Sequence, residues 1–193
     1  MPNKESDMRR MFTAVFVLLC SLAMVAQSAP PKPPATAGEV LERQFRGMER
    51  EFVPAAEAMP ADKYDFAPTD GEFKGVRTFA QQVKHVAAVN YMIAAALLGE
   101  KPPLDLQGEN GPDSIKSKDQ IVKFLKDSCA YTHKALATVN DKNLIEQIDG
   151  PFGGKSSRMS LASMATSHSF DHYGQMVEYL RMNGIIPPAS RQQ

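Results

Sequence analysis

Cysteine is scarce in this chain, tryptophan is absent, and neither sign of charge is in excess. The 193 residues contain two cysteines, Cys20 and Cys129, no tryptophan, and equal numbers of basic and acidic side chains. A chain without surplus positive charge or a basic patch lacks the electrostatic footprint of a nucleic-acid-binding protein. We therefore expect no nucleic acid among its partners. The short glycine-rich stretch at residues 153–156 (GGKS) has the wrong spacing for a phosphate-binding loop.

Long hydrophobic runs are also missing, with one exception at the N-terminus. Residues 11–25 carry no charge, follow Lys4, Arg9 and Arg10, and lead into small residues at 26–28. This arrangement is typical of a secretory signal peptide, and the run is short for a membrane span. We predict a signal peptide over residues 1–28, a proline-rich linker over residues 29–36 and one domain over residues 37–190. The alternative is an uncleaved membrane anchor.

Cleavage after Ser28 would leave an exported protein, periplasmic or secreted, with no further contact with the membrane. The mature chain would keep only Cys129, which excludes a disulfide within it. Its stability must then come from packing, with or without help from a metal ion. Cys129 falls in a helical pattern, so we expect it to be a small buried hydrophobic residue.

The domain has the periodicity of four amphipathic helices and no credible set of strands. Apolar residues recur at helical spacing over residues 37–58, 76–98, 118–139 and 159–183. Pro54 could kink the first of these helices. Two long connections, 99–117 and 141–157, contain glycine and proline and are predicted to be loops. The sequence therefore predicts an all-α fold, a four-helix bundle with two long connections.

Two of the four histidines lie close together on the last predicted helix. His168 and His172 have i,i+4 spacing, which stacks both imidazoles on one helix face, and that face is otherwise apolar. Two adjacent buried imidazoles are costly unless they are hydrogen-bonded or coordinate a metal ion. Both explanations are open on spacing alone. His85, on the second predicted helix, could supply a third imidazole, and three neutral imidazoles with an open fourth position are typical of a catalytic zinc site, or of nickel or iron.

Three stretches in this order resemble the DinB-like family of metal-binding four-helix bundles. The matching stretches are residues 59–68 (MPADKYDFAP), 78–87 (TFAQQVKHVA), and 168–188, which begins HSFDHYGQ and ends YLRMNGIIPP. The resemblance spans about residues 37–190. It implies that one divalent metal ion, zinc or nickel, is bound by His85, His168 and His172. It also implies that the protein could form homodimers, as relatives often do.

Other polar residues near these positions could support the site or the core. His133 could be a second-layer partner of the ligands, but an edge or solvated position is expected. Gln175 and Tyr179 share the apolar stripe with His168 and His172 and could orient them, although core packing is expected for Tyr179. Asn90 interrupts the apolar arc of the second helix and could serve a site or a helix–helix hydrogen bond. Asp171 is rotated off the stripe and is expected to face solvent or a helix edge.

Two classes of function are compatible with this pattern. The first is a metal-dependent enzyme, a transferase or hydrolase acting on a small-molecule substrate that the sequence does not identify. Some DinB-like relatives are thiol-dependent transferases, but export argues against that reaction because low-molecular-weight thiols are mainly cytoplasmic. The alternative is a non-enzymatic bundle in which the metal is structural or is the cargo. A weaker alternative is an interaction module whose histidines are ordinary core residues.

Overall fold

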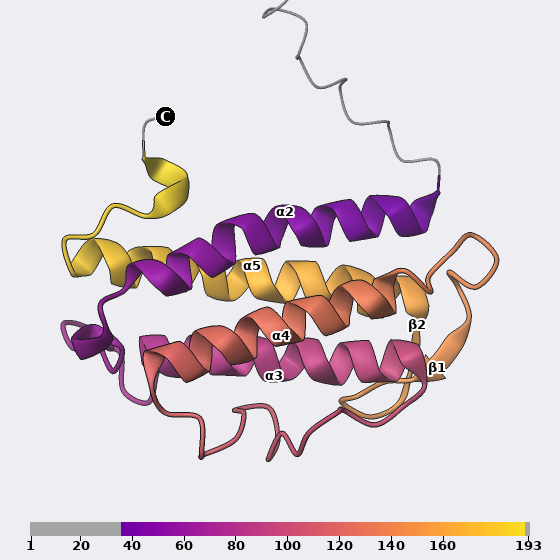
Figure 1. Cartoon of the computed structure of the whole chain (residues 1–193), viewed down its shortest axis with the longest axis horizontal. Helices are drawn as coiled ribbons and strands as arrows, with labels where there is room; N and C mark the ends of the chain where they lie inside the picture. Colours follow the sequence, from indigo (N-terminus) through magenta and orange to yellow (C-terminus); the bar gives the residue numbers. More distant parts are fainter. Residues whose placement is uncertain (1–35, 192–193) are drawn as a thin grey trace, which may run out of the picture. The chain divides into compact units, whose positions relative to one another are not determined.

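The four predicted helices are present in the computed structural model, which describes residues 36–191. They are α2 (Ala37–Ala58), α3 (Phe79–Leu98), α4 (Lys118–Leu136) and α5 (Arg158–Met182) (Figure 1). Two 3₁₀ turns, η1 (Ala61–Lys63) and η2 (Pro188–Ser190), and two short strands, β1 (Gln147–Asp149) and β2 (Lys155–Ser157), complete the fold. The predicted all-α class and four-helix bundle are confirmed. The predicted signal peptide and nearly all of the linker lie outside the described residues.

Hydrogen bonds from side chains decide where three of the helices begin. The side chains of Thr36, Thr78 and Ser117 each accept a hydrogen bond from the backbone N–H three residues further on. The side chain of that later residue accepts from the backbone N–H of the capping residue in return. These capping boxes satisfy backbone donors that the first helical turn leaves free. The box at Thr78 makes α3 start three residues later than its apolar pattern predicts. Gly99 ends α3 at the predicted place, with the left-handed φ of 70° that a C-terminal glycine allows.

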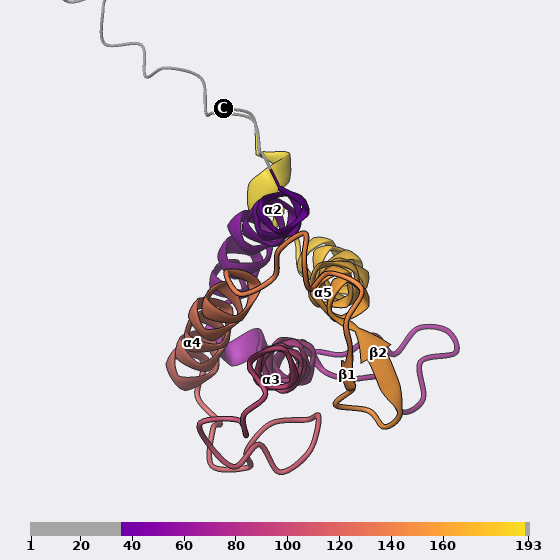
Figure 2. The same ribbon diagram turned by 90° about the vertical axis from the view of Figure 1, so that its right-hand side faces the viewer.

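The four helices enclose one hydrophobic core. Viewed end-on, α3 lies beside α4 and α5, and α2 lies beside the same two helices, so α2 and α3 are diagonally opposite (Figure 2). Pro54 is accommodated inside α2 without breaking it. The largest side chains at the centre are fully buried, among them Phe45, Phe52 and Phe79. Cys129 is also buried there, as predicted.

Helix α3 is buried on almost every side, which distinguishes it from the other three. Its sequence is apolar nearly all round, and such a helix must be covered by other parts of the chain. Besides α4 and α5, the connection from α3 to α4 runs along it (Figure 1). This connection, residues 99–117, carries Glu109, whose backbone carbonyl contacts α3 at His85. The long loop therefore supports the region in which His85 lies.

The prediction of a plain loop over residues 141–157 was wrong in one respect. A short antiparallel hairpin forms there, in which Gln147 pairs with Ser157 and Asp149 with Lys155. Sequence periodicity missed it because each strand has only three residues. Gly153 and Gly154, both with positive φ, make the tight reversal possible.

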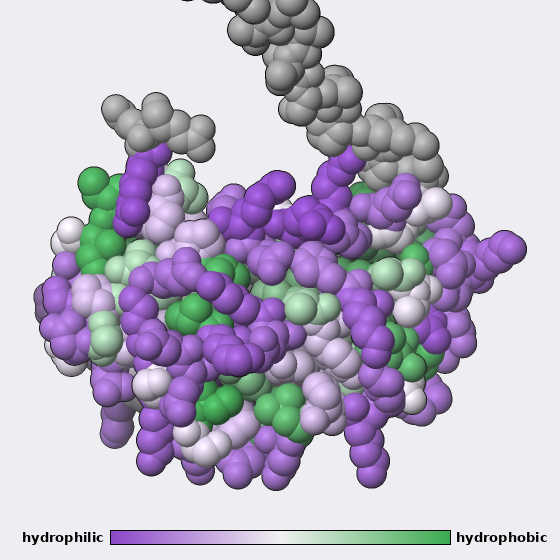
Figure 3. Space-filling model, viewed as in Figure 1, coloured by the Kyte–Doolittle hydropathy of each residue, from purple (hydrophilic) through white to green (hydrophobic). Residues whose placement is uncertain are grey.

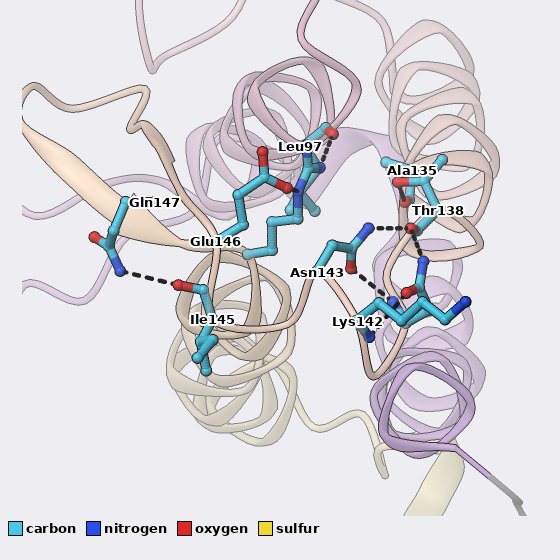
Figure 4. A network of polar contacts seen from close by, with 10 residues as sticks. Leu97, Ala135, Thr138, Lys142, Asn143, Ile145, Glu146 and Gln147 are labelled. Atoms are coloured by element: carbon cyan, nitrogen blue, oxygen red, sulfur yellow. Dashed lines mark hydrogen bonds and ion pairs between the residues drawn. The ribbon is translucent and has the colours of Figure 1, made fainter.

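Polar contacts fix both ends of this connection to the bundle (Figure 4). At its start, the Asn143 side-chain amide donates to the Thr138 carbonyl at 2.9 Å. At its end, Arg158 donates to the Leu97 carbonyl at 2.6 Å and to the Glu146 carboxylate at 2.8 Å. The hairpin is thus attached to the C-terminal end of α3 and the N-terminal end of α5.

The surface seen in Figure 3 is mostly hydrophilic, with hydrophobic residues scattered over it rather than gathered in one large patch. Among the described residues, every helix is too short or too polar to span a bilayer.

Candidate metal centre

Three imidazoles from two neighbouring helices converge on one point. His168 and His172 extend from α5, and His85 extends from α3, which packs against α5. The Nε2 atom of His168 lies 3.1 Å from Nε2 of His85 and 3.2 Å from Nε2 of His172. All three offer a ligand atom within 4.8 Å of the others. The meeting of His85 with the pair, which spacing alone did not determine, is therefore a feature of the fold.

The environment keeps these rings uncharged near neutral pH. Burial, assisted by the neighbouring imidazoles, lowers the pKa of His168 to about 4 and that of His172 to about 3. Burial and the nearby Arg77 guanidinium also lower the pKa of His85. A histidine binds a metal ion only in its neutral form. All three rings are therefore ready to act as ligands at physiological pH.

Hydrogen bonds on the far side of two rings fix which nitrogen carries the proton. Nδ1 of His85 donates to the Glu109 backbone carbonyl at 2.8 Å. Nδ1 of His172 donates to the side-chain oxygen of Gln82 at 2.5 Å. Because a neutral imidazole carries one proton, both Nε2 atoms present a lone pair toward the shared point. Nδ1 of His168 is buried and has no hydrogen-bond partner within residues 36–191.

The arrangement fits a small divalent cation. Ligand nitrogens that are each about 2.0–2.1 Å from a tetrahedral zinc ion lie about 3.3 Å from one another. The two nearest-neighbour separations in the cluster, 3.1 and 3.2 Å, are close to this value. Without a cation, the Nε2 lone pairs of His85 and His172 would both face Nε2 of His168. That nitrogen carries at most one proton, so it could donate to only one of them. The donor set and its spacing are therefore those of a three-histidine metal site.

The three histidines differ in their exposure to solvent. His85 and His172 are 4% and 7% exposed, whereas His168 is only half-buried. Charged groups stand nearby: the Arg77 guanidinium lies 3.6 Å from the Glu109 carboxylate and donates to the Asn110 side chain at 3.3 Å. Tyr179, on α5 towards its C-terminal end from the histidines, donates to the Arg77 backbone carbonyl at 3.1 Å. A charged rim thus adjoins a mostly buried donor set.

Of the other residues considered from the sequence, two lie away from the cluster. His133 is on α4, half-buried between Glu42 and Glu49 of α2, with Nε2 2.8 Å from the Glu49 carboxylate. It is an edge histidine, as expected. Asn90 is fully buried, and within the described part of the chain neither atom of its side-chain amide has a hydrogen-bond partner.

The remaining three residues adjoin the cluster in different ways. Tyr179 is buried as core packing requires, and its hydroxyl also anchors the segment before α3. Asp171 is exposed on α5, and Gln175 contacts both Asp171 and Gln82. Among the described residues, the cluster of potential ligands includes no carboxylate.

Sequence reasoning missed two groups that contact the histidines. Gln82 lies three residues before His85, so it occupies the same helix face, and that spacing could have pointed to it. The Glu109 carbonyl could not have been found in this way. It belongs to a backbone group in a long loop, and every residue has such a group.

Comparison with known proteins finds a matching family model and solved structures with a similar fold. A model of the DinB superfamily matches residues 44–176. Among solved structures, a DinB-like protein from Bacillus cereus has a TM-score of 0.61 and 18% identity, and the match covers 79% of this chain and 96% of that one. A DinB-like protein from Bacillus subtilis, YjoA, has a TM-score of 0.60 and 19% identity, with 80% and 99% covered.

A third similar structure is YfiT from Bacillus subtilis, described as a probable metal-dependent hydrolase with an unusual four-helix bundle topology. Its TM-score is 0.54 at 16% identity, and the match covers 83% of this chain and 96% of that one. At these identities the likeness concerns the fold. No curated protein is significantly similar in sequence.

Proposed function

Because this chain belongs to the DinB superfamily, we propose that its clustered histidines hold one divalent metal ion and that the protein is a metal-dependent enzyme. The ligands are His85, His168 and His172. The observation that carries the proposal is the convergence of their three Nε2 atoms, two of them with the proton held on Nδ1. Three ordinary core histidines would have their nitrogens satisfied by separate partners. Here, among residues 36–191, the Nε2 atoms have only one another as partners.

The donor set favours zinc or nickel. Imidazole nitrogen suits both ions, and three protein ligands are typical of catalytic rather than structural zinc. When bound, such an ion supplies Lewis-acid activation of water or of a substrate atom. The protein's own contribution is to keep three rings neutral and to fix the orientation of His85 and His172 through their Nδ1 atoms, with His168 the most exposed of the three.

Hydrolysis is the reaction that we favour, with group transfer as the second possibility. The description of YfiT as a metal-dependent hydrolase supports it by analogy. The predicted signal peptide also supports it, because an exported enzyme has water but little low-molecular-weight thiol available. Export itself is part of the proposal and rests on residues 1–28.

The alternative is a bundle in which the ion has a structural role. One observation favours it: the ligands come from α3 and α5, so an ion would cross-link two helices that also share the core. If this alternative holds, removing the ion lowers the melting temperature strongly and no substrate is turned over. If the enzyme proposal holds, chelation abolishes turnover while the circular dichroism spectrum is kept.

The first test is elemental analysis of protein expressed from the full-length sequence and purified without a His-tag or added metal. We expect about one zinc or nickel ion per chain. His168→Ala and His172→Ala should abolish stoichiometric metal, and His85→Ala should weaken binding strongly. His133→Ala is the matched control, because this remaining histidine contacts Glu42 and Glu49 instead. Full metal content in all three ligand variants would refute the site.

A further inference from the structure

The hydrogen bond between His172 and Gln82 belongs to a longer chain that crosses from α5 to α3 and back. We propose that Gln82 is a positioning residue for the metal ligand His172, and that Gln175 and Asp171 set the direction in which the Gln82 amide points. This inference rests on the proposed metal site and assigns roles to three residues outside it. Gln82 is 2% exposed, so its amide has few alternatives to these partners.

The geometry of the chain is continuous. Nδ1 of His172 donates to Oε1 of Gln82 at 2.5 Å. Nε2 of Gln82 donates to Oε1 of Gln175 at 2.8 Å, and Nε2 of Gln175 donates to the Asp171 carboxylate at 3.4 Å. Asp171 and Gln175 are one turn apart on α5, and His172 follows Asp171 directly. The chain therefore starts and ends on one helix and passes through a residue of its neighbour.

The direction of this chain follows from its exposed end. A carboxylate can only accept hydrogen bonds, so the Gln175 amide must turn its NH₂ group toward Asp171 and its oxygen toward Gln82. The buried Gln82 amide must then turn its NH₂ group toward Gln175 and its oxygen toward His172. An oxygen at that place requires the proton of His172 to be on Nδ1. The lone pair of Nε2 is thereby left free to face the other two histidines.

A reversed Gln82 amide would have the opposite result. Its NH₂ group would face Nδ1 of His172, which would then have to accept, and the proton would move to Nε2. A ring protonated on Nε2 cannot offer that nitrogen to a cation. The chain thus selects the ligating tautomer before any ion arrives.

His172 is the ligand for which such a device matters most. His85 has a backbone carbonyl on Nδ1, which accepts whatever the surrounding side chains are. His168 has no partner on Nδ1 among the described residues. Of the three ligands, His172 alone has its tautomer fixed by a side chain, and a substitution can remove that support.

Two substitutions of Gln82 separate positioning from packing. Gln82→Met fills a similar volume and removes the acceptor, whereas Gln82→Glu keeps an acceptor on Nδ1. We expect Gln82→Met to weaken zinc binding by about 10- to 100-fold, the usual effect of losing an outer-layer partner. Gln82→Glu should bind zinc better than Gln82→Met does. A merely structural role predicts the reverse order, because an added buried carboxylate is more disruptive than a thioether.

The experiment uses protein expressed from the full-length sequence and measures zinc affinity by competition with a chromogenic chelator. The second readout is the His172 tautomer in the metal-free protein, from ¹⁵N chemical shifts of the ring. Wild type should have the proton on Nδ1, and Gln82→Met should give a mixture of tautomers. Gln44→Met, at an exposed position on α2, is the control and should change neither readout.

The outer residues should have graded effects. Gln175→Met should reduce zinc affinity less than Gln82→Met, and Asp171→Asn by only about two- to threefold, because its hydrogen bond is long and exposed. Unchanged affinity and tautomer in Gln82→Met would overturn this proposal while leaving the metal site intact, provided that His172→Ala still loses zinc. If wild type binds no zinc or nickel, the proposed function fails, and the tautomer in the metal-free protein still tests the role of Gln82.

Discussion

Acid should destabilise the metal-free protein through its histidine cluster. The pKa values of His168 and His172 in the folded protein, about 4 and about 3, lie below the value of 6.5 expected in the unfolded chain. The unfolded state therefore binds more protons as soon as the pH falls below 6.5. The stability that comes from neutral, buried rings is fully present above pH 6.5. It is lost progressively as the pH falls toward the folded-state values.

The size of the effect follows from these pKa values. When a histidine stays neutral in the folded state while its unfolded form is protonated, the free energy of unfolding falls by about 1.4 kcal/mol for each pH unit of acidification. This amounts to about 2 kcal/mol between pH 6.5 and pH 5. The two rings lie against each other, and His168 is partly exposed, so simple doubling overstates the sum. We expect a combined loss of about 2–3 kcal/mol over this interval.

The assay is urea denaturation of chelator-treated protein at pH 6.5 and pH 5, followed by circular dichroism. The comparison is the double variant His168→Asn, His172→Gln, which keeps polar groups in place and cannot titrate there. Between the two pH values, the free energy of unfolding of wild type should fall by about 2–3 kcal/mol more than that of this variant. His85 is present in both proteins, and burial, the main cause of its lowered pKa, acts in both. Equal losses in the two proteins would refute the electrostatic account of the cluster.

Three further predictions concern the bundle around the site. Burial raises the pKa of the Cys129 thiol to about 12, so Cys129 should fail to react with a thiol reagent at pH 8 until the protein is unfolded, as absorbance would show. A Cβ added at Gly38 would overlap the Val139 carbonyl, so Gly38→Ala should destabilise the protein by about 1–3 kcal/mol. Gly174, in the interior of α5 with open space around it, is the matched control, and Gly174→Ala should stabilise the protein by about 0.5–1 kcal/mol in the same urea titrations. Phe45 is fully buried, and Phe45→Ala should cost about 3–5 kcal/mol, measured in the same way.

The helices could be predicted from sequence because their information is local. Apolar spacing and the cap at Gly99 located all four helices, and α2 matches its predicted bounds. The start of α3, which spacing missed, depends on the reciprocal caps of Thr78 and Gln81. The hairpin of β1 and β2 was missed because strands of three residues have no periodicity to detect.

The histidine cluster could be predicted only in part, for the same reason. His168 and His172 are neighbours through helix geometry alone, so spacing found them. That His85 joins them depends on how α3 packs against α5, which the family resemblance implied and the fold shows. The carbonyl of Glu109 required the path of a long loop, which no local pattern in residues 99–117 specifies.

Gln82 stands between these cases. Helices α3 and α5 are neighbours that share the histidine site. A side chain one turn from His85 on α3 must therefore lie beside a residue of α5. A glutamine can accept from an imidazole N–H with its oxygen and donate to a second buried partner with its NH₂ group. Glutamine at position 82, on the same face as His85, is therefore a recognisable signal once the site is accepted. Its buried amide and its contact with His172 are what that reasoning requires. Spacing finds His168 and His172, the packing of α3 against α5 adds His85, and the residue that orients His172 follows from asking what the turn before His85 must provide.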